Sequence, residues 1–247
     1  MPRKTITAPG DTKAENIANV GGSGATWDYV HGDTSPSSIL ADNNRMTTVR
    51  HISASNRYSI TRALILYDFR GSPIERDIKI ARAELILNDL VVAAGTTNGD
   101  KLTVGHVFNP NTFGSLHKDD YSLARYSVGG GRGDSRTSAQ QFTNGADGAI
   151  LTIDNQILLK EIEKAINRKT YLHLVVRNEL DSSDTAPGSG ELSRIWFDRP
   201  NADDNPMRLR LFYRIINNRK NPGARPGGVA RGFRGSSLFA GTNSGFS

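Results

Sequence analysis

Alternation of apolar and polar residues is the dominant pattern in the central part of the chain. In the segment 207–215, apolar residues occupy every second position and arginines fill three of the four positions between them. Successive side chains of a β-strand point to opposite faces, so this pattern predicts a strand with one buried face and one that faces solvent or a partner. The segment 80–87 alternates in the same way, which would place Ala81, Ala83, Leu85 and Leu87 opposite Arg82 and Glu84. Further strands are expected at 27–31, 46–52, 59–69, 102–108, 149–153, 171–177 and 194–197.

One segment has helical periodicity instead. After Asp154, which is a suitable N-cap residue, Ile157, Leu158, Ile162, Ala165 and Ile166 form one apolar stripe with charged residues outside it. We expect a short amphipathic helix that closes an open end of a sheet structure.

About ten short strands with 25 glycines and 10 prolines predict an all-β fold. Each sheet must bury one face, so we expect a two-sheet, jelly-roll-like β-sandwich over residues 26–216. Residues 1–25 have no sustained period and are expected to form an extended N-terminal leader. Residues 217–247 are rich in glycine and are expected to form an extended C-terminal arm.

The net charge of +6 is concentrated at the C-terminal end. Residues 217–247 contain five cationic residues and no acidic residue, whereas the body from 26 to 216 is neutral. The charge pattern therefore argues against binding of nucleic acid by the folded body.

The C-terminal arm has two interpretations. The stretch 231–235, Arg-Gly-Phe-Arg-Gly, is similar to nucleic-acid-binding segments, but it occurs once. The favoured interpretation is a docking arm that inserts Leu238 and Phe239 into a groove of a neighbour, because phosphate binding needs no apolar anchor. The expected docking residues are Arg219, Lys220, Arg225, Arg231, Phe233, Arg234, Leu238 and Phe239.

Several kinds of chemistry are not expected. The chain has no cysteine, which excludes disulfides, a thiolate nucleophile and cysteine-based metal sites. It has no apolar run long enough to span a membrane. The first residues lack the apolar region of a secretory signal, so we expect synthesis in the cytoplasm of a host cell.

The candidate polar sites are weak. The five histidines have no metal-ligand spacing, and His106 and His173 fall in expected strands as residues of a sheet face. Glu179, Asp181 and Asp184 form the best candidate for a Ca²⁺ site, although acidic residues in a loop more often stabilise turns. The glycine-rich segment 129–134 lacks the Gly-Lys-Ser/Thr ending of a phosphate loop and is interpreted as a flexible loop. No cofactor is expected.

Three segments in order resemble the DNRLRE domain family of phage and bacterial surface proteins. They are residues 62–69 with the following strand 80–87, residues 153–154 with 171–176, and residues 196–199 with the Pro-x-x-Leu-x-Leu-x-Tyr ending at 206–213. The resemblance covers roughly residues 26–215. It implies a jelly-roll-like scaffold for adhesion or carbohydrate binding, without catalysis, and it carries over no site residues.

These features together predict a non-enzymatic accessory structural protein of a tailed-phage virion, such as a head-decoration, collar or tail-associated subunit. Its partners would be other virion proteins in a multi-copy assembly that it joins through its terminal arms. The alternative is a module that binds host-surface polysaccharide, with Tyr121, Tyr126 and Trp196 as the available aromatic platforms. A third option, RNA binding through the arm, predicts an affinity that falls steeply with salt.

Overall fold

A computed structural model describes most of the chain up to Ile216. The described residues are 3–7, 14–22, 24–32, 38–40, 45–74, 76–88, 90–92, 101–110, 115, 117–126, 135–142, 149–197 and 207–216. The chain divides into a first unit, Met1–Ile216, and a second unit, Asn217–Ser247. The expected docking residues of the C-terminal arm all lie outside the described residues.

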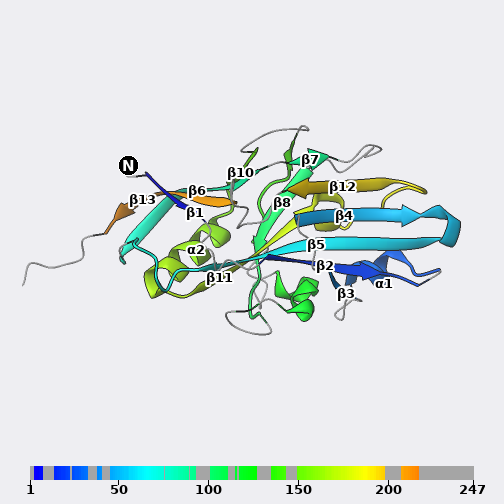
Figure 1. Ribbon diagram of the computed structural model, residues 1–247, viewed down its shortest axis with the longest axis horizontal. Helices are drawn as coiled ribbons and strands as arrows, with labels where there is room; N and C mark the ends of the chain where they lie inside the picture. Colours follow the sequence, from blue (N-terminus) through cyan, green and yellow to red (C-terminus); the bar gives the residue numbers. More distant parts are fainter. Residues whose placement is uncertain are drawn as a thin grey trace, which may run out of the picture. The chain divides into compact units, whose positions relative to one another are not determined.

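The described part is mostly β, with antiparallel sheets and few helices (Figure 1). The strands are β1 (Arg3–Thr7), β2 (Ala14–Val20), β3 (Ser38–Leu40), β4 (Arg45–Ile52), β5 (Arg57–Asp68), β6 (Ile78–Leu87), β7 (Val91–Val92), β8 (Lys101–His106), β9 (Gln140–Gln141), β10 (Ala149–Ile153), β11 (Tyr171–Asn178), β12 (Leu192–Phe197) and β13 (Arg208–Ile215). The helices are α1 (Trp27–Gly32), α2 (Gln156–Arg168) and α3 (Glu179–Ser182), with 3-10 helices at Ser53–Ser55, Lys118–Tyr121 and Leu123–Arg125. No helix among these described residues is long and apolar enough to cross a membrane.

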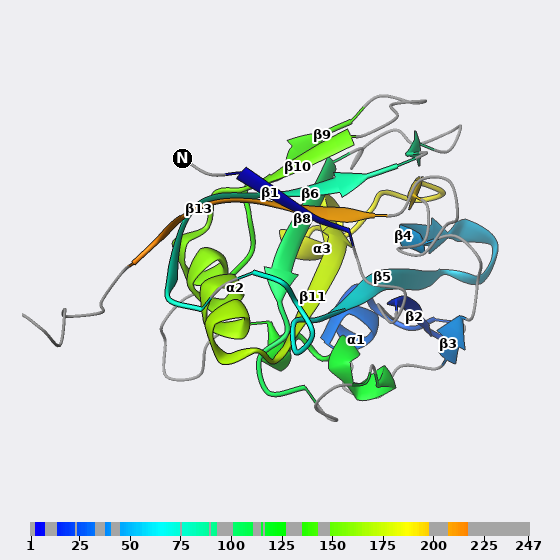
Figure 2. The ribbon, with the colours of Figure 1, turned by 60° about the vertical axis from the view of Figure 1, so that its left-hand side comes forward.

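The strands form two antiparallel sheets. The smaller sheet has the order β1-β13-β6-β10. The larger sheet has the order β7-β12-β4-β5-β11-β8-β9, and β2 pairs with both β5 and β3 (Figures 1 and 2). Each strand expected from residue 46 onward is present, with its ends moved by a few residues.

The N-terminal residues are part of the sheets, which corrects the expected separate leader. β1 pairs with β13 in the smaller sheet, and β2 pairs with β5 in the larger one. Residue 25 therefore marks no boundary. The alternation in residues 1–25 is too weak to indicate these strands. They depend on backbone hydrogen bonds to strands that are distant in the sequence, which a local pattern does not show.

The expected strand at 27–31 is wrong, because these residues form helix α1. Trp27, Val30 and His31 are buried, and their i, i+3 and i+4 spacing is that of one helical face. Gly21, at the end of β2, lies so close to this helix that a Cβ atom there would be 2.6 Å from Val30 Cγ2. A short aromatic-rich segment cannot be assigned by periodicity alone, and packing against β5 decides its structure.

The main core includes apolar side chains from both sheets. It joins apolar side chains of β6, β10 and β13 with those of β5, β8, β11 and β12. A second core covers the other face of β5, where Ile60, Leu64 and Leu66 contact Trp27, Val30 and Tyr121. Because β5 is buried on both faces, its apolar run is continuous instead of alternating.

Helix α2 is amphipathic, as predicted, and packs between β6 of the smaller sheet and β11 of the larger one (Figure 2). Its buried residues are Leu158, Leu159, Ile162, Ala165 and Ile166. The N-cap is Asn155 and not Asp154, because the Asn155 side chain accepts hydrogen bonds from the backbone N–H groups of Ile157 and Leu158.

Strand β6 contains a β-bulge at Ala81. Arg82 pairs with Phe212 and Ile80 pairs with Tyr213, so Ala81 has no partner on β13. The extra residue reverses the side-chain phase, which places Ile78 and Ile80 on the same buried side as Ala83. The prediction that Ala81 shares the face of Ala83 is therefore wrong: Ala81 is exposed.

Candidate functional site

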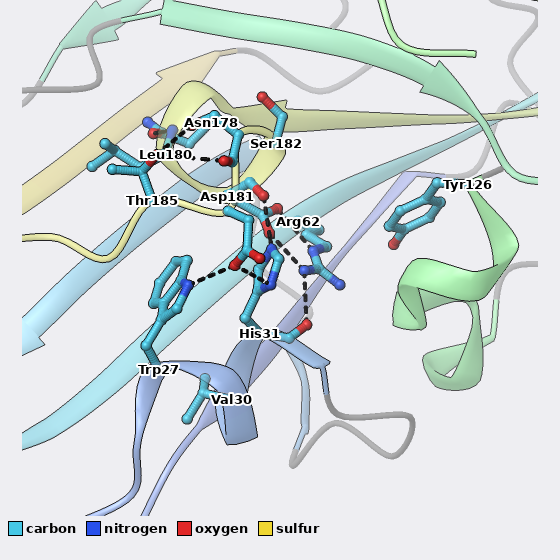
Figure 3. A network of polar contacts seen from close by, with 12 residues as sticks. Trp27, Val30, His31, Arg62, Tyr126, Asn178, Leu180, Asp181, Ser182 and Thr185 are labelled. Carbon is cyan, nitrogen blue, oxygen red and sulfur yellow. Dashed lines mark hydrogen bonds and ion pairs between the residues drawn. The ribbon is translucent and has the colours of Figure 1, made fainter. Parts of the chain in front are cut away.

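A fully buried ion pair between Arg62 and Asp181 forms the centre of a polar network (Figure 3). Arg62 lies in the middle of β5, and Asp181 lies on α3. Arg62 Nε donates to Asp181 Oδ2 over 2.8 Å, and Arg62 Nη2 donates to Asp181 Oδ1 over 2.6 Å. The geometry is bidentate, the strongest arrangement of this pair. It fixes α3 to the centre of the larger sheet.

His31 extends the network from α1. Its Nε2 atom lies 2.8 Å from the backbone oxygen of Asp181, and its Nδ1 atom lies 2.9 Å from Asp184 Oδ1. Trp27 stacks on the His31 ring at 4.9 Å (Figure 3). Its Nε1–H donates to Asp184 Oδ1 over 2.8 Å. These contacts join α1 to α3.

Two buried tyrosines surround the arginine. The Arg62 guanidinium carbon lies 3.9 Å from the ring centroid of Tyr121 and 5.5 Å from that of Tyr126. Arg62 Nη1 also donates to the backbone oxygen of Tyr121, and Tyr126 donates its hydroxyl to the same oxygen over 2.9 Å. The guanidinium is thus held by carboxylate, carbonyl and aromatic groups together.

The charges of the pair stabilise each other. Burial acts to lower the pKa of Arg62, but the Asp181 charge and the adjacent tyrosines outweigh it and hold that pKa above its ordinary value. Burial acts to raise the pKa of Asp181, but the charge and hydrogen bonds of Arg62 hold that pKa well below its ordinary value. Both groups are therefore charged at neutral pH.

The three carboxylates of the candidate Ca²⁺ site all have protein partners. Glu179 pairs with Lys101 at 3.1 Å, Asp181 pairs with Arg62, and Asp184 contacts His31 and Trp27. Across the residues that the structure describes, no group of three or more acidic or histidine side chains is arranged to hold a metal ion. Glu179 and Asp181 lie in helix α3 and not in a loop, and the contacts of all three acids connect secondary-structure elements.

A pocket of about 640 Å³ lies at a different place, where α2 meets β8 and β11. Its lining includes His106 at the end of β8, Phe108 in the following turn, Lys164 and Arg168 on α2, and Tyr171 and His173 on β11. The pocket has the size of a small-molecule binding site.

Two uncharged histidines line this pocket. Burial, together with the charges of His173 and Lys164, lowers the pKa of His106 to about 3. Burial lowers the pKa of His173 to about 4. Both imidazoles are therefore neutral at physiological pH, and each ring offers one hydrogen-bond donor and one acceptor.

The expected aromatic platforms for a sugar are mostly absent from the surface. Tyr121 and Tyr126 are buried against Arg62, which corrects their interpretation as exposed candidates. Trp196 on β12 is half-buried, with the Arg194 guanidinium 5.5 Å from its ring centroid. The glycine-rich segment 129–134 lies outside the described residues.

Sequence reasoning missed Arg62 as a partner of Asp181. One signal was present: Arg62 is the only charged residue in the mostly apolar segment 60–66, which is buried on both faces. A charge in such a position needs a counter-charge, but the sequence does not show which acid supplies it.

Comparison with known proteins identifies no family. No protein-family model matches the chain, and no curated protein matches it. The resemblance to the DNRLRE domain family therefore stays a prediction.

Proposed function

We propose that this chain is a non-enzymatic accessory structural protein of a tailed-phage virion, such as a head-decoration, collar or tail-associated subunit. We further propose that its two sheets form a jelly-roll-like β-sandwich. The shared core between β6, β10 and β13 on one side and β5, β8 and β11 on the other supports this architecture.

The observation that carries the proposal is the segregation of charge from the folded body. The first unit ends at Ile216, directly after β13, and the residues beyond it contain five cations and no acid. A basic, glycine-rich segment of this composition buries too little apolar surface to fold alone. It is suited to fold upon a partner, with Leu238 and Phe239 as apolar anchors.

The buried network supports a structural role for the body. Arg62 and Asp181 connect β5 to α3, and His31 and Asp184 connect α1 to α3. The polar groups of these four residues form hydrogen bonds and ion pairs with one another. Such a network favours a rigid body that can be displayed on a particle.

The N-terminal residues take no part in the proposed docking. Because β1 and β2 belong to the sheets, the docking role falls to residues 217–247. The partners would be other virion proteins, present in many copies, so that weak contacts add up to firm attachment.

Deletion of residues 217–247 tests this proposal. Particles produced with full-length or truncated protein would be purified on a density gradient and compared by quantitative mass spectrometry. We expect the truncated body to keep its circular dichroism spectrum and melting temperature but to be lost from particles. Equal incorporation of the two forms would refute the docking role.

The alternative function, binding of host-surface polysaccharide, retains one observed platform. Trp196 is half-buried on β12, next to the Arg194 side chain. If this function is correct, the body should bind on a glycan array and Trp196→Ala should lose the signal, because stacking on a sugar ring needs the indole.

A further inference from the structure

The pocket beside α2 combines an apolar wall with a cationic rim. The Phe108 ring packs edge-on against His106, with ring centroids 4.5 Å apart, and Pro110 and Val107 continue this wall. Tyr171 lines the pocket as well, and the Arg70 guanidinium lies 4.4 Å from its ring centroid. Aromatic side chains on two elements suit a flat apolar ligand.

The charge of the rim is positive. Lys164 and Arg168 are one turn apart on α2 and therefore share a face. Lys164 is paired with Glu161 at 3.0 Å. Arg168 has no ion pair within the part of the chain that the structure describes. The rim thus has one uncompensated cation, which matches a single negative charge on a ligand.

Of the two histidines that line the pocket, His173 is buried and His106 is half-buried. Burial is the main cause of the low pKa of both His106 and His173. His106 Nδ1 is buried and has no hydrogen-bond partner among the described residues. A polyhydroxylated ligand would need a polar partner for each hydroxyl, whereas an apolar ring loses little on entering such a site.

We infer that this pocket binds a small aromatic monocarboxylate, with its ring against Phe108 and Tyr171 and its carboxylate paired with Arg168. The site lies in the first unit, so the inference does not depend on the proposed docking by residues 217–247. It adds a ligand-binding function to the folded body.

Titration of the full chain with sodium benzoate at pH 7 tests the inference. We expect saturable binding by calorimetry, with a dissociation constant on the order of 1 mM, as a ligand of this size allows. Arg168→Gln should weaken binding about tenfold, because it removes a charge-assisted contact. Lys160→Gln is the matched control. Lys160 is also exposed on α2 but does not line the pocket, so the affinity of this variant for benzoate should be unchanged.

Three further probes define the ligand class. Benzamide has the ring without the charge, and acetate has the charge without the ring, so each should bind at least about tenfold more weakly than benzoate. Glucuronate tests a sugar acid. The inference is overturned if benzoate shows no saturable binding, if Arg168→Gln binds like Lys160→Gln, if benzamide or acetate equals benzoate, or if glucuronate binds more tightly than benzoate.

A second variant checks the aromatic wall. Phe108→Leu keeps an apolar side chain but removes the ring, and we expect a several-fold loss of benzoate affinity with none for acetate. Unchanged benzoate affinity in a variant with the wild-type melting temperature would contradict the assigned pose.

Discussion

Arg62 and Asp181 are 119 residues apart in the sequence and form a bidentate ion pair in which both side chains are fully buried. The pair joins the central strand of the larger sheet to a helix of one turn. A buried pair of this kind contributes little net stability compared with apolar residues, but loss of one partner leaves a buried charge alone.

Asp181→Asn should therefore lower the free energy of unfolding by about 3–5 kcal/mol. The double variant Arg62→Met, Asp181→Leu should regain most of this loss, because no buried charge remains. Urea unfolding followed by circular dichroism measures both. The matched control is the solvent-facing pair Arg70–Asp68, where Asp68→Asn should cost at most about 1 kcal/mol. Equal losses at the two sites would contradict the role given to burial.

Lowering the pH should destabilise the folded protein at pH values that are still well above the ordinary pKa of carboxylates. The pKa values of His106 and His173 fall from an ordinary 6.5 to about 3 and about 4 in the folded protein. The unfolded chain therefore binds more protons than the folded one as pH drops below about 6.5, and stability falls through this window by up to about 1.4 kcal/mol per pH unit for each histidine.

The double variant His106→Gln, His173→Gln should remove this slope, because glutamine does not titrate. Melting temperatures between pH 4 and pH 8 test the prediction, and the region above pH 7 serves as the internal reference where both proteins should show the same slope. A wild-type melting temperature that stays constant from pH 7 to pH 5 would show the prediction to be wrong. Below about pH 3.8, both proteins should lose further stability, because the Asp181 carboxyl takes up a proton in the unfolded chain while Arg62 holds its pKa well below that value in the folded protein.

Two adjacent residues, Asp154 and Asn155, have different roles at the N-terminus of α2. Asn155 accepts hydrogen bonds from the N–H groups of Ile157 and Leu158, so Asn155→Ala should cost about 1 kcal/mol of unfolding free energy. Asp154 accepts one exposed hydrogen bond, from the Ser138 N–H, and Asp154→Ala should cost less. Denaturant unfolding measures the free energy lost in each variant. A larger loss for Asp154→Ala would support Asp154, the residue predicted from the sequence, as the N-cap.

The bulge in β6 can be tested by deletion. Without Ala81, regular pairing with β13 would turn Ile78 and Ile80 toward the opposite face. We expect a loss of roughly 3 kcal/mol or more, since each isoleucine gives up about 1.5–3 kcal/mol of burial. Ala81→Ser, which keeps the chain length at an exposed position, should stay within about 0.5 kcal/mol of the wild type. Chemical denaturation of both proteins is the measurement, and a mild effect of the deletion would argue against the phase reversal.

The candidate site was only half visible in the sequence. The sequence analysis selected Asp181 as an acidic candidate, but it did not select Arg62, although a charge in a mostly apolar segment needs a partner. Their pairing could not be derived, because several acids in the chain could have supplied the counter-charge. The pocket was invisible for a similar reason: His106, Arg168 and Tyr171 come from three elements and share no motif.

The sequence by itself determined the longer strands from residue 46 onward and helix α2, but not the two-residue strands β7 and β9, because alternation and helical spacing are local properties that show only over several residues. It also determined where the acid-free basic segment begins. Tertiary structure alone decided that residues 1–25 contribute strands, that residues 27–32 are helical and that β6 contains a bulge. These features depend on hydrogen bonds and packing between segments that are far apart in the sequence, and local periodicity carries no information about such partners.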